Sequence, residues 1–307
     1  MRAPTSEALI VSYESKLHAL RLLRDLAPLR ARLQVTLFDN ASRDGTVAAV
    51  GRAYPWVRVL QSEENLGYAG ALRAALPKLG GERLWLLNAD VRLPRPDVLL
   101  RLEGELERDP LAGAVGPALL DVDGRLSGGA GGADLSLGSA ALHFSGLSQL
   151  SETWRRGALY LPQRAYAARR RPLAVDWIAG TAPLIRREAL ERAGGVPPGP
   201  FLYGEDLLLS RALRRAGYRV LYCPQARVVH VGQGSQPALD GRWVRGTLSL
   251  SPPRERRALA LCFATGLGAR LALAHLQRLR PPRSAPSLVQ RRRLLAVSLR
   301  AALSELA

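Results

Sequence analysis

Short apolar runs alternate with stretches of helical periodicity over the first 120 residues. The apolar runs occupy residues 8–13, 34–39, 56–61 and 83–90. Because each is about as long as a buried strand and is followed by polar residues, the pattern predicts four strands. Apolar residues recur at helical spacing in 17–29, 44–53 and 67–79. Strands that alternate with helices indicate βαβ units, so the pattern predicts an α/β fold with a mostly parallel central sheet and helices on both faces.

The alternation stops after residue 120. A glycine-rich stretch, 124–146, predicts an irregular segment, and the arginine-rich stretch 151–171 predicts an excursion from the core. Regular structure is expected again from Val175, with a helix at 205–216 and a strand at 218–222.

Beyond Gly232 the pattern predicts a glycine-rich loop and then two arginine-rich helices. We expect these helices at about 253–279 and 287–304, separated by Pro281-Pro282. The predicted domain organisation is therefore an α/β domain over residues 1–232 and a basic helical extension over residues 233–307.

The net charge of +18 is concentrated towards the C-terminus. From Arg254 onward there are 11 arginines against Glu255 and Glu305, which is half of the total charge. Such clustering is typical of proteins that bind nucleic acid, an anionic membrane surface or phosphorylated substrates. Coding bias explains it equally well, because the chain has 42 arginines and only two lysines.

The cysteines and the apolar segments indicate the cellular compartment. Cys223 and Cys262 are the only cysteines, so neither a disulfide framework nor a cysteine-based zinc site is expected. The N-terminal residues lack a signal-peptide pattern. The longest apolar stretch, about Ala258–Ala269, is shorter than a membrane span and is followed by Arg270. We therefore expect a cytoplasmic protein that attaches, at most, to the inner face of the membrane.

Polar side chains follow the predicted strands at the point where each strand ends. Tyr13 ends the first strand, Asp39 ends the second, and Asn88 and Asp90 end the fourth. Ligands of parallel sheets bind beyond the carboxyl ends of the strands. Ionising Asp90 there requires a positive partner, and hard oxygen ligands suit Mg²⁺ or Mn²⁺.

An adjacent acidic pair, Glu205-Asp206, follows a glycine- and proline-rich loop and begins a predicted helix. Most acidic pairs in this position only cap the helix. A helix N-terminus also keeps a carboxylate ionised, as a general base requires. His230 ends the region 24 residues after Asp206 and on its own is most often a structural histidine.

These segments together resemble the family 2 glycosyltransferases of the GT-A fold, in particular the bacterial rhamnosyltransferase-like branch. The matching segments span about residues 8–232, in the order of the family: LIVSYES, LFDNASRDGT, ENLGYAGALRAAL, LWLLNAD, GTAPLIRREALERAGG and GEDLLLSRALRRAGYRVLYCPQARVVH. Each segment is weak alone, but several in order are specific.

The resemblance implies a role for each matching residue. The donor nucleotide sugar would contact Ser12, Tyr13, Glu14, Asp39, Asn65, Gly67, Arg73, Asn88 and Asp90. A divalent metal, Mg²⁺ or Mn²⁺, would be held by Asp90 and His230. The acceptor would lie near Trp177, Gly180, Thr181 and Glu205, with the Trp177 ring against a sugar face. Asp206 would be the base, and Glu205 would orient the acceptor.

The implied reaction is an inverting transfer of a sugar from a UDP- or dTDP-linked donor to a hydroxyl of a glycan or lipid-linked acceptor. A carboxylate assists loss of the hydroxyl proton, and cations stabilise the leaving diphosphate. Three roles suit the basic C-terminal helices: binding to an anionic membrane surface, packing on the catalytic domain, or contact with a second copy in a homodimer.

Some residues depart from the family pattern. Glu14 and Arg73 stand where the family has asparagine, Gly195–Pro198 replaces a glycine-Phe-Asp segment, and Leu208 replaces a second acid. Two alternatives remain open: a catalytically degenerate sugar-nucleotide-binding protein, and a nucleic-acid-binding basic protein. The second is disfavoured, since Phe263 is the only aromatic residue in the C-terminal basic helices.

Overall fold

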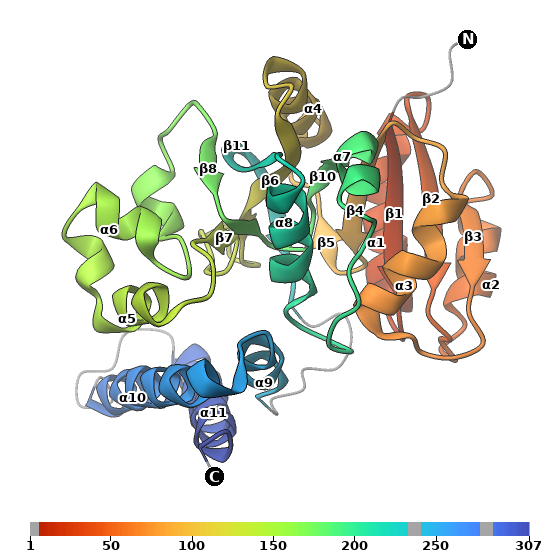
Figure 1. Cartoon of the computed structure of the whole chain (residues 1–307). Helices are drawn as coiled ribbons and strands as arrows, with labels where there is room; N and C mark the ends of the chain where they lie inside the picture. Colours follow the sequence, from red (N-terminus) through yellow and green to blue (C-terminus); the bar gives the residue numbers. More distant parts are fainter. Residues whose placement is uncertain (1–5, 233–240, 277–284, 307) are drawn as a thin grey trace. The chain divides into compact units, whose positions relative to one another are not determined.

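The computed structural model describes residues 6–232, 241–276 and 285–306, and the side chains of the last helix from Arg292 onward. These residues form two compact units (Figure 1). Unit 1 comprises residues 1–132, 160–201 and 205–237, and unit 2 comprises 133–159, 202–204 and 238–307. Unit 2 thus combines the C-terminal extension with two segments that precede residue 232.

Unit 1 is built on one mixed sheet with the strand order β3-β2-β1-β4-β10-β6-β11-β5, and β8 also pairs with β11. The strands are β1 (Ser6–Ser12), β2 (Leu33–Asp39), β3 (Arg58–Gln61), β4 (Arg83–Asn88), β5 (Val91–Arg92), β6 (Ala112–Leu120), β8 (Leu173–Val175), β10 (Leu184–Arg186) and β11 (Arg219–His230). The first four are parallel, and β10 is antiparallel to both β4 and β6. The predicted fold class is confirmed.

Helices cover both faces of this sheet. They are α1 (Lys16–Leu26), α2 (Thr46–Ala53), α3 (Gly67–Ala75), α4 (Val98–Arg108), α7 (Arg187–Arg192) and α8 (Glu205–Arg215), with 3-10 turns η1 (Ala27–Leu29), η2 (Leu76–Lys78) and η4 (Gln163–Tyr166). Alternate residues of β1 point to opposite faces. Leu9 and Val11 belong to the cluster shared with α3, whereas Ala8 and Ile10 are buried on the other face. An uninterrupted apolar run is therefore the expected sequence for this strand.

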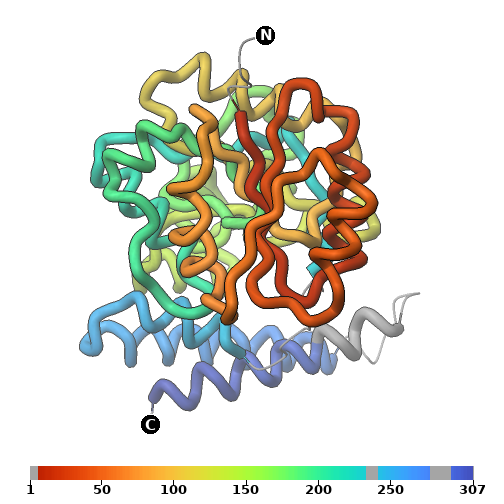
Figure 2. Tube along the Cα trace, turned by 90° about the vertical axis from the view of Figure 1, so that its right-hand side faces the viewer, coloured from red at the N-terminus to blue at the C-terminus, as the bar shows by residue number. Residues whose placement is uncertain are grey.

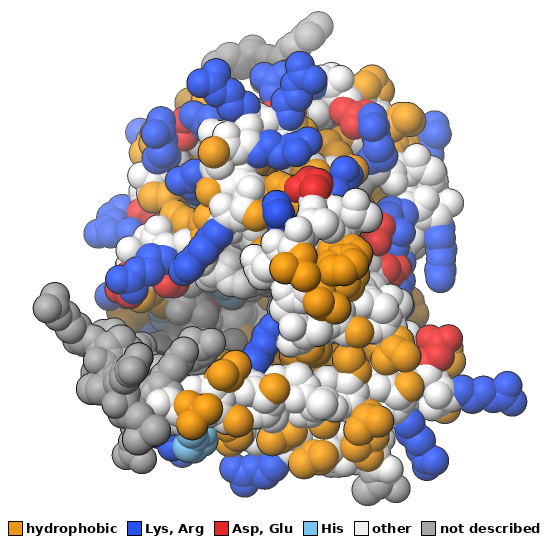
Figure 3. Space-filling view, turned by 90° about the vertical axis from the view of Figure 1, so that its left-hand side faces the viewer, with side chains coloured by type: hydrophobic (Ala, Val, Ile, Leu, Met, Phe, Trp, Pro, Cys, Tyr) orange, Lys and Arg blue, Asp and Glu red, His pale blue; other side chains and the backbone are white. Residues whose placement is uncertain are grey.

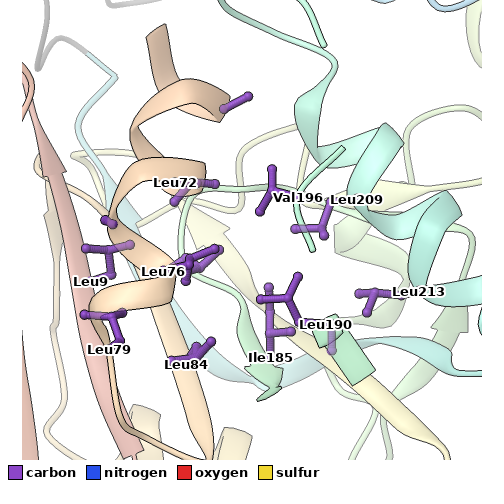
Figure 4. Packing of buried hydrophobic residues seen from close by; sticks show 14 of the residues in the cluster. Leu9, Leu72, Leu76, Leu79, Leu84, Ile185, Leu190, Val196, Leu209 and Leu213 are labelled. Atoms are coloured by element: carbon purple, nitrogen blue, oxygen red, sulfur yellow. The ribbon is translucent and has the colours of Figure 1, made fainter. Parts of the chain in front are cut away.

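The core on one face holds α3, α7 and α8 against the sheet. Figure 4 shows the converging side chains, which are Leu72 of α3, Leu76 of η2, Leu190 of α7, Leu209 and Leu213 of α8, and Leu9, Leu84 and Ile185 of the strands. Both α3 and α8 begin at the carboxyl edge of the sheet, so this packing fixes their first turns relative to the strand ends.

The strand β11 differs from the prediction. It runs over Arg219–His230 rather than 218–222, with an irregularity between Cys223 and Arg227. Its last residues pair with the short strand β5, His230 opposite Val91. A two-residue strand directly after Asp90 therefore brings His230 to the end of β4.

A separate two-stranded sheet pairs β7 (Gly131–Gly132) with β9 (Trp177–Ile178). Part of the glycine-rich segment 124–146, predicted as irregular, is thus a strand, and part is a helix of unit 2. The extended arrangement at Gly131 leaves no room for a side chain, because a Cβ there would lie 2.4 Å from the Trp177 carbonyl oxygen. Glycine is required here by close packing rather than by disorder.

Unit 2 is helical. Its elements are α5 (Leu137–Ser145), η3 (Leu147–Gln149), α6 (Glu152–Gly157), α9 (Arg242–Ser249), α10 (Pro253–Leu276) and α11 (Ala285–Ser304). The helix α9 replaces part of the loop predicted after Gly232. The two predicted C-terminal helices are present, and Pro281-Pro282 lies outside the described residues.

Aromatic side chains hold unit 2 together. Phe263 of α10 packs edge-on against Phe144 of α5 at 4.9 Å between ring centroids, and Trp243 of α9 lies 6.0 Å from Phe263. The guanidinium of Arg270 lies 5.0 Å from the centre of the Phe144 ring. Gly266 allows this approach, because a Cβ there would overlap the Phe144 ring. In Figures 1 and 2 α10 and α11 lie side by side.

The absence of a membrane-span candidate, expected from the sequence, is corrected. Helix α10 has 24 residues and a window of mean hydropathy 1.5, of which 39% is buried within the protein, so it is long and apolar enough to cross a bilayer. The prediction stopped at Arg270, but alanine and leucine continue the apolar composition to Leu276.

Candidate active site

Three buried oxygen atoms at the carboxyl ends of adjacent strands have no hydrogen-bond partner in the described protein. They are Ser12 Oγ on β1, Asp39 Oδ1 on β2 and Asn88 Oδ1 on β4. Ser12 is directly opposite Asp39, and Val11 is opposite Asn88. Because buried polar groups are almost always hydrogen-bonded, three unpaired oxygens at one sheet edge indicate a site for a polar ligand.

Asp39 is fully buried. Its Oδ2 accepts the Ser42 N–H at 2.9 Å, which leaves Oδ1 for a ligand. Burial raises the pKa of Asp39 above its ordinary value, although the hydrogen bonds from Ser42 oppose the rise. The turn that follows includes Ala41 at φ +67°, a left-handed conformation that is uncommon for alanine.

Tyr13 and Glu14 form the outer wall of this edge. Tyr13 is 38% exposed. Glu14 has φ +48° and is held by two contacts: its N–H donates to Ser42 Oγ at 2.9 Å, and its Oε1 accepts the Arg43 N–H at 2.7 Å. Glu14 therefore shapes the turn, and one of its carboxylate oxygens is already engaged.

Asn40, which the sequence analysis did not assign, organises the loop before α3. Its Nδ2 donates to Asn65 Oδ1 at 2.9 Å, and its Oδ1 accepts the Leu66 N–H at 2.9 Å. Asn65 Oδ1 also accepts the Gly67 N–H at 3.0 Å. Asn65 and Gly67, predicted as donor residues, thus lie beside the Asp39 strand end and begin α3.

Asp90 and His230 meet as predicted. His230 Nε2 lies 3.4 Å from Asp90 Oδ2, which also accepts the Gly232 N–H at 3.0 Å. No group of three or more His, Cys, Asp or Glu side chains converges anywhere in the described residues. Two protein ligands still fit Mg²⁺ or Mn²⁺, which retain waters and share substrate phosphates, and the unpaired Asn88 oxygen lies two residues from Asp90.

Asp206 lies in the first turn of α8, where the helix N-terminus favours a negative charge. Burial raises the pKa of Asp206 to about 6, against the N–H groups of Leu207 and Gly180, which donate to the carboxylate and lower it. The Leu207 N–H lies 2.9 Å from Oδ1. This carboxyl group is therefore poised to exchange a proton near neutral pH.

Tyr68 is a site residue that the sequence analysis missed. Its hydroxyl donates to the Gly180 carbonyl at 2.8 Å. Burial raises the pKa of Tyr68 far above its usual range, and the charges of Glu205, Asp206 and Asp90 add to the rise. The phenol therefore keeps its proton and lies among the three predicted acidic residues.

Gly180 lies between Tyr68 and Asp206. An added Cβ at Gly180 would lie 3.5 Å from Tyr68 Cε1 and 3.7 Å from Asp206 Cβ. Next to it, the buried Thr181 accepts the Asn88 N–H through its carbonyl at 3.0 Å. The segment Gly180-Thr181 thus joins Asp206 directly to the end of β4.

The structure overturns one predicted contact. Trp177 is only 3% exposed and packs edge-on against Tyr160 at 5.5 Å between ring centroids, so its ring offers no face to a sugar. Arg73 is exposed on α3, and its guanidinium donates to the Pro197 carbonyl at 3.3 Å in the loop before α8.

The missed residues had only weak signals in the sequence. Asn40 follows Asp39 at a strand end, and Tyr68 follows the glycine that begins a helix. Neither position indicates which distant segment the side chain contacts.

Comparison with known proteins places this geometry in a family. Residues 4–246 match the model of "Glycosyltransferase like family 2". An N-acetylglucosaminyl-diphospho-decaprenol L-rhamnosyltransferase of Mycobacterium tuberculosis is 33% identical over 232 residues, which are 72% of this chain and 74% of that protein.

Solved structures share the fold. A mannosyltransferase of Pyrobaculum calidifontis, in complex with GDP-mannose and Mn²⁺, has a TM-score of 0.59 at 20% identity and covers 99% of this chain and 87% of its own. GalNAc-T7 with UDP, GalNAc and Mn²⁺ has a TM-score of 0.56 at 19% identity and covers 81% of this chain and 48% of its own.

Proposed function

Because this chain belongs to glycosyltransferase family 2, we propose that it transfers a rhamnosyl residue from a UDP- or dTDP-linked donor to a hydroxyl of a lipid-linked glycan. The mycobacterial relative, whose name specifies rhamnosyl transfer to a diphospho-decaprenol acceptor, supports the sugar and the acceptor class. A cytoplasmic location, predicted from the sequence, is part of the proposal.

One observation supports this function above the others. The unpaired oxygens of Ser12, Asp39 and Asn88 lie at the same sheet edge as Asp206, and the first turn of α3 links the two groups through Gly67 and Tyr68. A site with donor-binding oxygens at one end and a raised-pKa carboxyl group at the other is what a transfer between two bound sugars requires.

The donor end binds and orients the nucleotide sugar. Asp39 Oδ1 is positioned to accept a hydrogen bond from a base N–H or a ribose hydroxyl, and Ser12 Oγ is available beside it. Asp90 and His230 would hold a divalent metal, which when bound supplies positive charge that stabilises the leaving diphosphate.

Proton transfer takes place at the acceptor end of the site. Asp206 accepts the proton of the acceptor hydroxyl as that oxygen forms its bond to the anomeric carbon. The bond from the anomeric carbon to the diphosphate oxygen breaks at the same time, and the diphosphate leaves with the electron pair. Attack from the side opposite the leaving group inverts the anomeric carbon.

Tyr68 acts as a positioning residue in this scheme. Its hydroxyl fixes the Gly180 carbonyl, and the Gly180 N–H donates to the Asp206 carboxylate. Glu205 lies next to Asp206 in the first turn of α8 and in this scheme would contact the acceptor.

The test combines Asp206→Asn with a transfer assay. With dTDP-rhamnose or a UDP-sugar, Mn²⁺ and a polyprenyl-diphosphate-linked GlcNAc acceptor, the variant should keep donor affinity and lose on the order of 10²–10⁴-fold in kcat. NMR of the product should show an inverted anomeric centre. Wild-type rates in the variant would exclude Asp206 as the base.

The same assay distinguishes the alternatives. A catalytically degenerate binding protein would bind the nucleotide sugar and show no transfer even as wild type. A nucleic-acid-binding protein would bind oligonucleotides with a strong salt dependence and would not respond to nucleotide sugars.

A further inference from the structure

The outer face of α10 is apolar along most of the helix. The opposite side packs into unit 2 through Leu259, Phe263 and Leu267, which are buried. The exposed residues between the first turn and the end of the helix are Ala258, Leu261, Thr265, Ala269, Ala272, Leu273, His275 and Leu276. We define the outer face of α10 as these residues without His275.

This face is one continuous stripe. At 3.6 residues per turn its members fall within about 120° of arc, and the stripe from Ala258 to Leu276 is about 27 Å long. Leu261, Leu273 and Leu276 are 58%, 58% and 62% exposed. The only hydroxyl of the stripe, that of Thr265, donates to the Leu261 carbonyl at 2.6 Å, so it needs no water.

Unit 2 as a whole carries a strongly positive charge. Unit 2 contains fifteen arginines against five acidic residues, so it holds +10 of the net charge of +18 in about a third of the chain. At the N-terminal end of the stripe the exposed Arg254 and Arg257 outnumber the exposed Glu255. Figure 3 shows hydrophobic side chains along the band formed by the C-terminal helices, with arginines projecting from it.

We propose that the outer face of α10 docks unit 2 flat on an anionic lipid bilayer. An apolar stripe buries itself among the acyl chains while arginines meet anionic headgroups. A second copy of the chain is disfavoured as the occupant because it brings the same +10 charge. This lipid binding is separate from the proposed sugar transfer, since it requires neither the donor nor the acceptor.

The contacts of α10 with α5 favour an orientation in which the helix lies flat on the membrane. The Arg270 guanidinium donates to the His143 carbonyl at 2.9 Å and lies against Phe144, and Gly266 contacts the same ring. Crossing the bilayer would require α10 to leave these partners in α5.

The test is cosedimentation of the full chain with vesicles of phosphatidylcholine, with and without phosphatidylglycerol. The wild type should bind the anionic vesicles and bind the neutral ones at least about tenfold more weakly. The double variant Leu261→Glu/Leu273→Glu should reduce binding to anionic vesicles by at least about tenfold, as expected for removing exposed leucines from the interface.

Leu100→Glu is the matched control, because Leu100 is a 51% exposed leucine on helix α4 of unit 1. It should bind vesicles like the wild type. Circular dichroism should show that each variant retains the wild-type melting temperature, and transfer to a water-soluble acceptor analogue should be unchanged in the double variant. If the wild type bound vesicles but showed no sugar transfer, that result would contradict the proposed function and leave the lipid-binding proposal intact.

Three outcomes would overturn the proposal. They are equal binding of the double variant and the wild type, lipid-independent dimerisation that Leu261→Glu/Leu273→Glu abolishes, and resistance of vesicle-bound protein to extraction by alkaline carbonate. The second outcome would assign the face to a second copy, and the third would show that α10 spans the bilayer.

Discussion

The ionised form of Asp206 destabilises the fold. Its pKa is raised from 3.8 to about 6, mainly by burial. The folded protein therefore binds a proton more tightly than the unfolded chain does. Between these two pH values stability falls as pH rises, and above the higher one the loss is complete.

Asp206→Asn should therefore stabilise the protein at neutral pH. The amide has the size of the carboxyl group and no charge to bury, so we expect a gain of about 1–3 kcal/mol in the free energy of unfolding at pH 8. The gain should shrink as pH falls through 6 and disappear below about 4. Urea denaturation of both proteins across this range measures it; a gain that is the same at every pH would contradict the linkage.

Tyr68→Phe should slow transfer without weakening donor binding. Loss of the hydroxyl leaves the Gly180 carbonyl without its donor, and a hydrogen bond of about 1 kcal/mol corresponds to roughly a fivefold decrease in kcat. The Gly180 N–H should then hold the Asp206 carboxylate less firmly, so the acidic limb of the pH–rate profile should move to higher pH.

Tyr54→Phe is the control for this variant. The Tyr54 hydroxyl also donates to a backbone carbonyl, that of Leu20 at 3.1 Å, but it links α2 to α1. It should leave kcat and the pH profile unchanged. A shifted profile in Tyr54→Phe, or none in Tyr68→Phe, would contradict the positioning role.

At the residue scale, the sequence predicted which residues belong to the candidate site better than it predicted what their side chains contact. Asp39, Asn88 and Asp90 were identified because they end strands of a parallel sheet, where ligands of such sheets bind. The stacking role of Trp177 was wrong because a sequence does not show that Tyr160 packs against the ring. The residues Asn40 and Tyr68 were missed because their partners lie in other segments.

At the scale of elements, the start of α3 depends on one glycine. Gly67 has φ +67°, and a Cβ there would lie 2.2 Å from the Phe201 carbonyl oxygen. Gly67→Ala should reduce stability by about 2 kcal/mol or more, because it combines a strained backbone with a clash against main chain. It should also weaken nucleotide binding, since Asn40 Nδ2 donates to the Gly67 carbonyl at 3.3 Å.

Gly51→Ala is the control for Gly67→Ala and should have the opposite effect on stability. Gly51 lies within α2, and a Cβ there meets nothing within 4 Å. Alanine is favoured over glycine inside a helix, so this variant should be up to about 1 kcal/mol more stable. Chemical denaturation should separate the two variants; equal effects would show that the contact with Phe201 is unimportant.

Elements were predictable where one pattern determined them. Strands β1, β2 and β4 followed from apolar runs, because strands buried on both faces of a parallel sheet require them. The length of β11 and the presence of β7, α5 and α9 were not predicted. Glycine-rich sequence suits both a loop and close packing, as the close approach of Gly131 to the Trp177 carbonyl oxygen shows, and only tertiary structure distinguishes them.

For the whole molecule, ligand binding should appear as a change in melting temperature. Binding to the folded state alone adds about 2.7 kcal/mol when the ligand is at 100 times its Kd. UDP or dTDP with Mn²⁺ should therefore raise the melting temperature, and EDTA should reduce the shift. Asp90→Ala and His230→Ala should reduce it in the same way.

Asp123→Ala controls for a lost carboxylate, because Asp123 is exposed and pairs only with Arg125 among the contacts seen in this structure. Its shift should equal that of the wild type. A full shift in EDTA, or in Asp90→Ala, would exclude Asp90 from metal-assisted nucleotide binding.

The course of the chain limits how this enzyme can be recombined. Leu202–Gly204 belongs to unit 2, where Gly246 of α9 lies against Tyr203, and the next residue in the chain is Glu205. The segment that precedes Glu205 and Asp206 is therefore shaped by a helix some forty residues further on. A chimaera that exchanges only the C-terminal extension between relatives would pair a foreign α9 with the native Leu202–Gly204. Acceptor preference should then transfer intact only when those three residues are exchanged together with the extension.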